Sequence, residues 1–253
     1  MAMASEVPMV SVVIPCYNMG EFIEETIASV KSQTFRSFEI IVVDDGSDTT
    51  KTVECLDRLA SEGAVLLYRT PNNGVASARN HGIQKARGTF ILPLDADDLI
   101  EPNFLEKAIR AFEDHPETAI VCCDAMMFGA LSGLRCLPEF SRERLLSENL
   151  LFAASLFRKS DWLAVGGYAT AMKYGWEDWD FWITMTKRGA VIVKIPEPLL
   201  KYRIRNDSRD RLMTLRQKTT MLLKIVVRHW ECYAGSPVSL IRLVGNSRLS
   251  RSL

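Results

Sequence analysis

The chain has 253 residues, of which 47% are hydrophobic and 25% charged, so it holds enough apolar material for a full core in one large globular domain. Its 31 basic and 31 acidic residues cancel, which leaves no global field to recruit nucleic acid, and we expect no nucleic-acid partner. The six cysteines lack paired metal-ligand spacing, the N-terminal segment lacks a secretory pattern, and no apolar run is long enough to span a bilayer. We therefore expect reduced thiols in a cytoplasmic protein.

Short β-branched runs alternate with helical patterns in the first half of the chain. Residues 10–14 and 39–43 are expected strands, and residues 21–33 between them carry apolar side chains at helical spacing. The pattern continues with expected strands at 64–68, 90–94 and 119–123 and expected helices at 75–85 and from Pro102. This alternation predicts an α/β fold with a mostly parallel central sheet flanked by helices, in which ligands bind at the carboxyl ends of the strands.

The pattern loosens beyond Leu131. Residues 139–149 are charged and helix-prone, residues 151–157 are apolar, and Gly166-Gly167 breaks the next segment of the chain. We interpret residues 1–210 as one domain and residues 211–253 as a C-terminal helical extension.

Polar and acidic residues follow the first two expected strands. Pro15 ends the first strand and Asn18 is expected to cap the helix near Gly20. The second strand ends in Asp44-Asp45, where a carboxylate can accept from a base imide N–H or a ribose hydroxyl. Asp48, shortly beyond, is expected to act only as a helix cap.

A turn and a helix of small residues follow the third expected strand, at residues 72–82. Arg79 on this helix is as consistent with a structural role as with one in the crevice of the acidic loops. We interpret His81, like His115 and His229, as outside any site, since none has a neighbour in sequence that suggests ligation.

The most informative stretch is Asp95-Ala96-Asp97-Asp98, directly behind the apolar run 90–94. Side chains alternate along an extended segment, so Asp95 and Asp97 leave on one side while Asp98 points elsewhere. Clustered carboxylates repel each other, and a divalent cation or hydroxyl donors between them relieve that repulsion. Taken alone, the stretch is also compatible with an acidic turn that precedes a helix.

A second acidic group lies at residues 176–180. Asp178 opens an expected helix in which tryptophan and phenylalanine side chains supply an apolar wall, and such a wall raises the proton affinity of a carboxylate. A carboxylate of raised proton affinity can take a proton from a reacting hydroxyl group, which makes Asp178 a candidate general base. The alternative is a core helix whose first-turn acids are favoured by the helix dipole.

Taken in order, these segments resemble the signature of the family 2 glycosyltransferases over about residues 10–208. The segments that carry the resemblance are Pro15-Cys16-Tyr17-Asn18, Val43-Asp44-Asp45-Gly46-Ser47, Asn73-Gly74, Ala78-Arg79-Asn80 with Gly82, Asp95-Ala96-Asp97-Asp98 with Pro102, Gly166-Gly167-Tyr168 and Trp176-Glu177-Asp178-Trp179-Asp180. The resemblance implies a GT-A (Rossmann-like) fold, a nucleotide-sugar donor with UDP as the commonest carrier, a divalent metal and inversion at the anomeric carbon. It further implies a nucleotide-binding half at about 1–125 and an acceptor and catalytic half at 126–210.

The resemblance also assigns roles to individual residues. Donor nucleotide binding is expected of Pro15, Tyr17, Asn18, Asp44, Asp45, Gly74, Arg79, Asp95, Ala96, Arg203 and Arg205. Asp97 and Asp95 would hold Mn or Mg, since oxygen ligands favour these metals over zinc. Asp178 and Glu177 are the expected catalytic residues, and Trp176 and Trp179 the expected acceptor contacts.

One position departs from the family pattern. The family commonly carries a histidine that completes the metal site where this chain has Arg205, and arginine cannot ligate a metal. We expect Arg205 and Arg203 to contact the donor diphosphate directly and the metal to be held more weakly than is usual.

The tail has two interpretations. Residues 221–228, among Arg216, Lys218, Arg242, Arg248 and Arg251, form either a basic amphipathic helix on an anionic membrane or a helix packed on the main domain.

We expect an inverting transferase that extends a cell-surface polysaccharide or glycolipid, with a glycan or lipid-linked acceptor, on the inner face of the membrane. The alternatives are a non-catalytic nucleotide-sugar-binding or scaffold module, and a sugar nucleotidyltransferase, for which the glycine-rich basic loop after the first strand is missing. The sequence does not set the oligomeric state.

Overall fold

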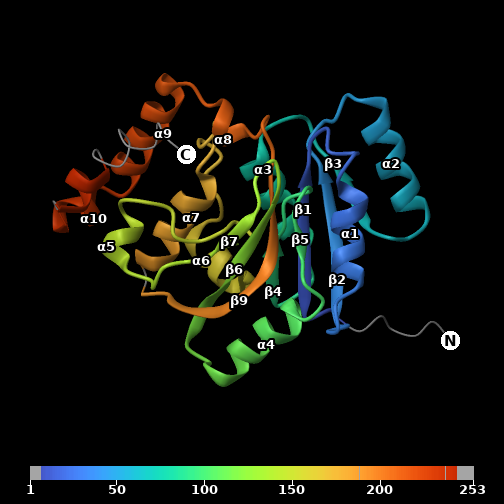
Figure 1. Ribbon diagram of the computed structural model, residues 1–253, viewed down its shortest axis with the longest axis horizontal. Coiled ribbons are helices and arrows are strands. Elements are labelled where there is room, and N and C mark those ends of the chain that lie inside the picture. The colour runs from blue at the N-terminus through green and yellow to red at the C-terminus, as the bar shows by residue number, and fades with distance from the viewer. Residues whose placement is uncertain (1–6, 188, 237, 244–253) are drawn as a thin grey trace.

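The computed structural model describes residues 7–187, 189–236 and 238–243. Within these residues the strands are β1 Val10–Cys16, β2 Phe38–Asp44, β3 Leu66–Arg69, β4 Phe90–Pro93, β5 Leu99–Ile100, β6 Thr118–Gly129, β7 Gly133–Arg135, β8 Leu156–Arg158 and β9 Val191–Ile204. The helices are α1 Ile23–Lys31, α2 Thr50–Ser61, α3 Val75–Lys85, α4 Phe104–Asp114, α5 Arg142–Leu145, α6 Lys159–Val165, α7 Glu177–Lys187, α8 Arg209–Leu212, α9 Leu215–Arg228 and α10 Trp230–Gly235. Figure 1 shows α2 on one side of the sheet, and α9 and α10 on the other.

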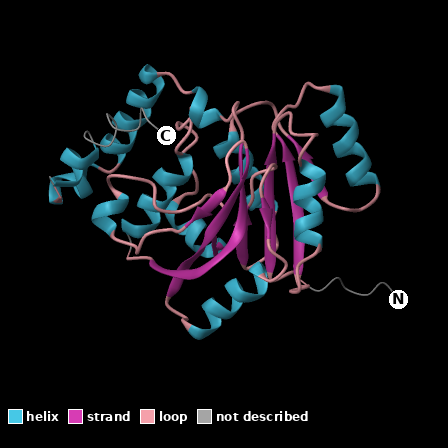
Figure 2. Cartoon of the chain, viewed as in Figure 1, coloured by secondary structure: helices cyan, strands magenta, loops and turns pink. Residues whose placement is uncertain are grey.

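The strands of the described residues form one sheet in the order β3-β2-β1-β4-β8-β6-β9-β5, with β7 paired to β6. The pairs β3–β2, β2–β1, β1–β4 and β6–β9 are parallel, whereas β8 runs antiparallel to both β4 and β6. Figure 2 shows the sheet in the middle of the molecule with helices around it. The predicted α/β fold is confirmed. The antiparallel strands β7 and β8 lie in the second half, where the sequence pattern is loose, and the two-residue strand β5 pairs antiparallel with β9.

The first two strands show why this half of the chain is readable from sequence. All seven residues of β1 are buried, as expected of a parallel strand covered by helices on both faces. Helix α3 packs close to this layer. A Cβ on Gly82 would lie only 2.5 Å from Val13 Cγ1, so only glycine permits this approach. The close packing holds α3 against the strands whose carboxyl ends carry the acidic loops.

Several expected boundaries were wrong. Helix α4 begins at Phe104 and not at Pro102, and the helix-prone stretch 139–149 contains only the four residues of α5. Pro15 does not end β1, since it remains paired with Val43 in the parallel register. Proline lacks the backbone N–H, but a strand continues past it if the other residues pair.

The described part of the C-terminal extension is mostly helical. Thr214 starts α9 with a capping box, in which its side chain accepts from Gln217 N while the Gln217 side chain accepts from Thr214 N. None of the helices in the described residues is both long and apolar enough to cross a bilayer. Arg248 and Arg251, which the sequence analysis assigned to the basic tail, lie outside the described residues.

Candidate active site

A cleft of about 810 Å³ opens at the carboxyl ends of the parallel strands. Asp45 enters it from the end of β2, Asp95 and Asp97 from the loop after β4, and Asp178 from the start of α7. The structure therefore brings the separate acidic segments together, as expected from the position of each one after a strand or at a helix start.

The loop after β1 contributes Pro15 and Tyr17 to the cleft. Asn18 has a left-handed backbone (φ 55°), and its Oδ1 accepts from the backbone N–H groups of Asp48 and Thr49. Asn18 therefore does not cap α1, and Asp48 accepts a hydrogen bond from Asn18 Nδ2 instead of capping a helix. Both expected caps were wrong, because the two loops bind each other.

The two acids after β2 separate in function. The Asp44 side chain is buried and accepts from Ser47 N and Arg69 Nε, so it holds its own loop together and does not line the cleft. Asp45 lines the cleft and binds the next loop, accepting from Asn73 N at 3.0 Å and Gly74 N at 2.8 Å. Asp45 is thus the only member of the pair that lies at the cleft.

The acidic stretch after β4 is anchored by α1 and by β9. Thr26 Oγ1 donates to the carbonyl of Ala96, and Arg203 Nε donates to the carbonyl of Asp97. Asp98 also lines the cleft, but its side chain is buried and accepts from Arg203 N at 2.8 Å, so it is held by the backbone of β9. Burial, reinforced by the charge of Asp95, raises the pKa of Asp97 to about 6.

A buried arginine joins the two acidic groups. Arg79 is 1% exposed and donates to Glu177 Oε1 at 2.7 Å and to Asp95 Oδ1 at 2.6 Å. Burial by itself would lower the pKa of Arg79, but the carboxylates of Asp95 and Glu177 outweigh it and raise that pKa. Arg79 therefore connects the loop after β4 to the first turn of α7.

Glu177, which precedes the cleft residue Asp178 on α7, is paired with arginines and is not a free carboxylate. Its side chain is 2% exposed, and Arg209 from α8 donates to both of its oxygens, at 2.9 and 3.0 Å. Although burial acts to raise the pKa of Glu177, the charges of Arg209 and Arg79 lower it. Glu177 thus stays ionised and holds α7 in place, which does not match the catalytic role expected for it.

Asp178 is the half-buried carboxylate of α7 that faces the cleft. Its Oδ2 accepts from Asn149 Nδ2 at 2.9 Å and its Oδ1 from Trp179 N at 2.8 Å. Burial and the neighbouring charge of Glu177 raise the pKa of Asp178 to about 6. At neutral pH this carboxylate is ionised and more basic than an ordinary aspartate, which suits it to accept a proton.

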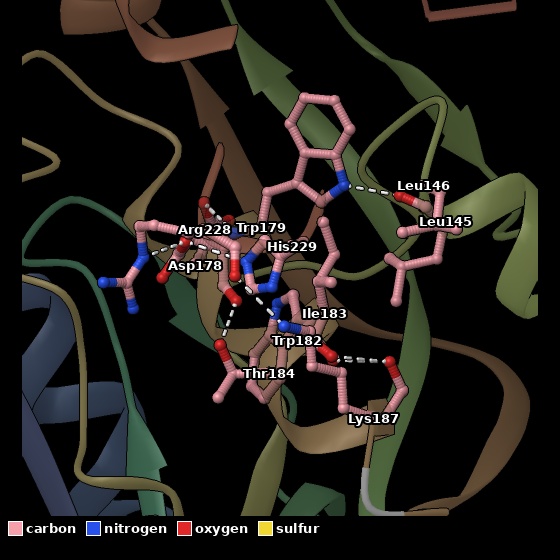
Figure 3. A network of polar contacts seen from close by, with 12 residues as sticks. Leu145, Leu146, Asp178, Trp179, Trp182, Ile183, Thr184, Lys187, Arg228 and His229 are labelled. Atoms are coloured by element: carbon pink, nitrogen blue, oxygen red, sulfur yellow. Dashed lines mark hydrogen bonds and ion pairs between the residues drawn. The ribbon is translucent and has the colours of Figure 1, made fainter. Parts of the chain in front are cut away.

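The two expected acceptor tryptophans lie in different places. Trp176 lines the cleft with a left-handed backbone (φ 62°), a strained conformation that is common at functional sites. Trp179 is 5% exposed, and its indole N–H donates to the carbonyl of Leu145, as Figure 3 shows. The expectation for Trp179 was wrong, because its position on α7 points it into the core and away from the cleft.

A buried polar cluster ties the tail to α7. The Oδ1 atom of Asp180, a residue that is 1% exposed, lies 3.0 Å from His229 Nε2 and 2.8 Å from Arg228 Nε. Burial would raise the pKa of Asp180, but these partners lower it. His229, which the sequence suggested was outside any site, fixes α9 against the helix that carries Asp178.

The residues at the cleft fit a divalent cation that is shared with a bound diphosphate. Asp95 and Asp97 supply the hard oxygen atoms that Mg and Mn prefer, and the repulsion between them is of the kind that a cation relieves. No cluster of three potential metal ligands of the His, Cys, Asp or Glu type occurs in the described ranges. Arg205 Nη1 instead lies 3.1 Å from Asp97 Oδ2, so the protein alone supplies few ligands.

Three residues that hold the site were missed from sequence: Asn149, Arg209 and His229. Each lies far along the chain from its partner, and Asn149 sits in a stretch that the charge pattern favoured as helix. No local signal identifies such a residue, because its role depends on which distant loop packs beside it.

The curled sheet with its helices and its acidic cleft defines a GT-A fold, the class of nucleotide-sugar transferase structures. Residues 11–133 match the model of glycosyl transferase family 2, which confirms the resemblance seen in the sequence.

The curated relatives include a hyaluronan synthase of Pasteurella multocida, 29% identical over 190 residues, and an uncharacterised glycosyltransferase of Haemophilus influenzae, 29% identical over 200 residues. The match covers 73% of this chain and 19% of the synthase, and 76% of this chain and 67% of the Haemophilus protein. The chain therefore spans about a fifth of the length of the synthase.

Solved structures share the fold at low sequence identity. The crystal structure of S. aureus TarS 1-349 superposes with a TM-score of 0.72 at 20% identity, covering 96% of this chain and 72% of that one. The mannosyltransferase PcManGT from Pyrobaculum calidifontis, in complex with GDP-Man and Mn2+, superposes with a TM-score of 0.68 at 19% identity, covering 98% of this chain and 77% of that one. These likenesses establish the fold.

Proposed function

We propose that the protein is a metal-assisted inverting glycosyltransferase that moves a sugar from a nucleotide-sugar donor to a hydroxyl of a glycan or lipid-linked acceptor. The observation that carries the proposal is the single cleft that gathers Asp45, Asp95 and Asp97 from strand ends and Asp178 from α7. Donor-side acids and a basic carboxylate in one cavity are the groups that direct displacement at an anomeric carbon requires.

Asp178 is the proposed general base. Its raised pKa makes it a better proton acceptor, and its bonds from Asn149 and Trp179 N hold the carboxylate in one orientation at the cleft. Arg79 and Arg209 hold the adjacent Glu177, so the first turn of α7 is fixed before an acceptor arrives. We assign Glu177 to this positioning role.

Asp95 and Asp97 would hold the divalent cation, which when bound would offset the negative charge that develops on the leaving diphosphate. Arg203 and Arg205 lie on the same side of the cleft and would contact that diphosphate as well. Asp45, Pro15, Tyr17 and Gly74 would form the nucleotide end of the cleft.

The donor is proposed to be a UDP-sugar. A structure of TarS 1-349 is a complex with UDP-GlcNAc and has this fold, although the PcManGT complex contains GDP-Man. Relatives named hyaluronan synthase and chondroitin synthase support a role in polysaccharide synthesis. We further propose that residues 1–125 bind the nucleotide, that residues 126–210 bind the acceptor, and that the reaction takes place on the cytoplasmic side of the membrane.

The proposal predicts selective stabilisation by nucleotides. UDP or a UDP-sugar with Mn2+ at about 100 times its Kd should stabilise the protein by about 2.7 kcal/mol, because a ligand of the native state alone shifts the unfolding equilibrium. A thermal-shift series with UDP, GDP, ADP and CDP, each with and without Mn2+, measures this. If no nucleoside diphosphate raises the melting temperature, the proposal is wrong.

Arg205 gives a second prediction, on metal binding. The wild-type chain should bind Mn2+ weakly without nucleotide, and Arg205→His should tighten that binding by on the order of tenfold, because imidazole can ligate the metal and guanidinium cannot. Isothermal titration with Mn2+ alone measures both. Arg205→Ala is the control, since it removes the ion pair with Asp97 without adding a ligand. An equal gain in Arg205→Ala, or tight Mn2+ binding by the wild type, would contradict the prediction.

The Arg205–Asp97 ion pair also favours a second candidate, a module that binds nucleotide-sugar without turnover. Release of UDP from a UDP-sugar, measured with and without candidate acceptors, separates the two. Binding without any release, across a broad set of donors and acceptors, would favour the module.

A further inference from the structure

Helix α9 has apolar side chains on two opposite faces. Met221 and Ile225 are fully buried against the body of the protein, so the packed-helix interpretation of the tail is correct for this face. On the other face Leu215, Leu223 and Val227 are 64%, 60% and 70% exposed. Packing on the domain therefore accounts for only half of the apolar character of this helix.

We call the exposed apolar residues of α8, α9 and the start of α10 the tail stripe. It consists of Leu212, Leu215, Leu223, Val227 and Trp230. Their spacing along the chain is close to multiples of one helical turn, which places Leu215, Leu223 and Val227 on one side of α9. Exposed apolar surface of this kind, next to charged residues, marks contact with a partner or a membrane.

Charge around the tail stripe selects the partner. Residues 209–243 contain seven basic residues against two acidic ones, in a chain whose net charge is zero. The basic residues are Arg209, Arg211, Arg216, Lys218, Lys224, Arg228 and Arg242, and the acidic ones Asp210 and Glu231. Arg211 and Arg216 are exposed beside the stripe, and such a combination suits the headgroups of an anionic bilayer. A second copy of the chain would place basic side chains against basic side chains.

The tail stripe begins at the rim of the cleft. Leu212 belongs to the stripe and also lines the cleft. Met213 and Gln217, which are outside the stripe, line the cleft from the same segment. Arg228 and His229 lock the other end of α9 onto Asp180 of α7, so the stripe has a fixed orientation relative to Asp178. A bilayer beneath the stripe would therefore lie beside the cleft mouth.

We propose that the tail stripe lies on the surface of an anionic lipid bilayer and presents a lipid-linked acceptor to the cleft. The membrane contact follows from the tail alone, whereas the acceptor rests on the proposed glycosyl transfer. The contact is interfacial: the apolar side chains enter the headgroup region while the arginines and lysines bind the anionic lipids.

The test is co-sedimentation of the full chain with lipid vesicles. Vesicles of phosphatidylcholine with about a third phosphatidylglycerol should pellet the protein at low salt, and phosphatidylcholine alone or about 1 M salt should not. The double variant Leu223→Glu, Val227→Glu should reduce the partition coefficient about tenfold, since it removes two apolar contacts and adds repulsion. Leu163→Glu on α6 is the matched control, because Leu163 is 63% exposed and lies outside the stripe. It should pellet like the wild type.

Three results would overturn the membrane contact: wild-type protein that stays in the supernatant with anionic vesicles, a double variant that pellets like the wild type, or a loss in Leu163→Glu as large as that in the double variant. Sedimentation velocity without lipid tests the alternative occupant of the stripe, a second copy of the chain. If the wild type is a dimer that the double variant dissociates, the stripe is an interface between copies. The UDP-dependent thermal shift, measured on the same preparation without vesicles, reports the proposed glycosyl transfer separately.

Discussion

Replacing Asp178 with asparagine is expected to lower kcat by about 10²- to 10⁴-fold while the affinity for the nucleotide donor stays unchanged. Asparagine has nearly the same shape but cannot accept a proton from the acceptor hydroxyl. The donor-side acids Asp45, Asp95 and Asp97 are untouched. Single-turnover transfer and nucleotide titration measure the two quantities. Asp161→Asn, on α6 and outside the cleft lining, serves as the control.

The pH dependence gives the same role a separate test. A general base must be ionised, and the pKa of Asp178 is raised to about 6, so kcat/KM should be full above that pH and be lost as pH falls through it. Full activity of Asp178→Asn, or an acid limb near the ordinary aspartate pKa of about 4, would remove Asp178 from this role.

The raised pKa of Asp178 also affects stability, and this effect changes with pH in the direction opposite to activity. A carboxyl whose folded pKa lies above its unfolded value favours folding when protonated, and this contribution is lost as pH rises through about 6. Asp178→Asn should therefore be at least as stable as the wild type at neutral pH. A loss of activity combined with a stable fold excludes unfolding as its cause.

Replacing Arg79 with methionine is expected to destabilise the protein by about 3–5 kcal/mol, because it removes one partner from a buried ionic network. Glu177 would keep Arg209, but Asp95 would lose its partner of 2.6 Å in a cleft already crowded with carboxylates. Arg79 also lowers the pKa of Asp178, so any remaining activity should show its acid limb at a higher pH. Urea unfolding and a pH profile of kcat/KM measure the two effects.

Arg58 provides a matched control for Arg79. It also pairs with two carboxylates, those of Glu24 and Glu62, but its side chain is 47% exposed. Solvent screens such pairs, so Arg58→Met should change stability far less than Arg79→Met does. Equal losses in Arg58→Met and Arg79→Met would show that burial does not set the importance of the Arg79 network.

The sequence predicted most of the first half of the fold, although α2 and β5 were missed, for a physical reason that β1 illustrates. A strand buried on both faces must be a continuous apolar run, and the residues that follow it must be polar because they emerge at the sheet edge. Helix α3 was predicted with its observed bounds for the same kind of reason. The second half contains antiparallel strands and short helices, such as β8 and the four-residue α5, which are too short to impose a period on the sequence.

The order of amino acids was sufficient to predict the family resemblance, the α/β fold and most of the cleft acids, because an acid directly after a buried strand has one edge of the sheet to which it can go. Tertiary packing, in contrast, set what each side chain does there. It turned Trp179 inward, bound Glu177 between two arginines and paired His229 with Asp180. These outcomes depend on contacts between residues more than 30 positions apart, and local periodicity and propensity carry no information about which distant group will supply the partner.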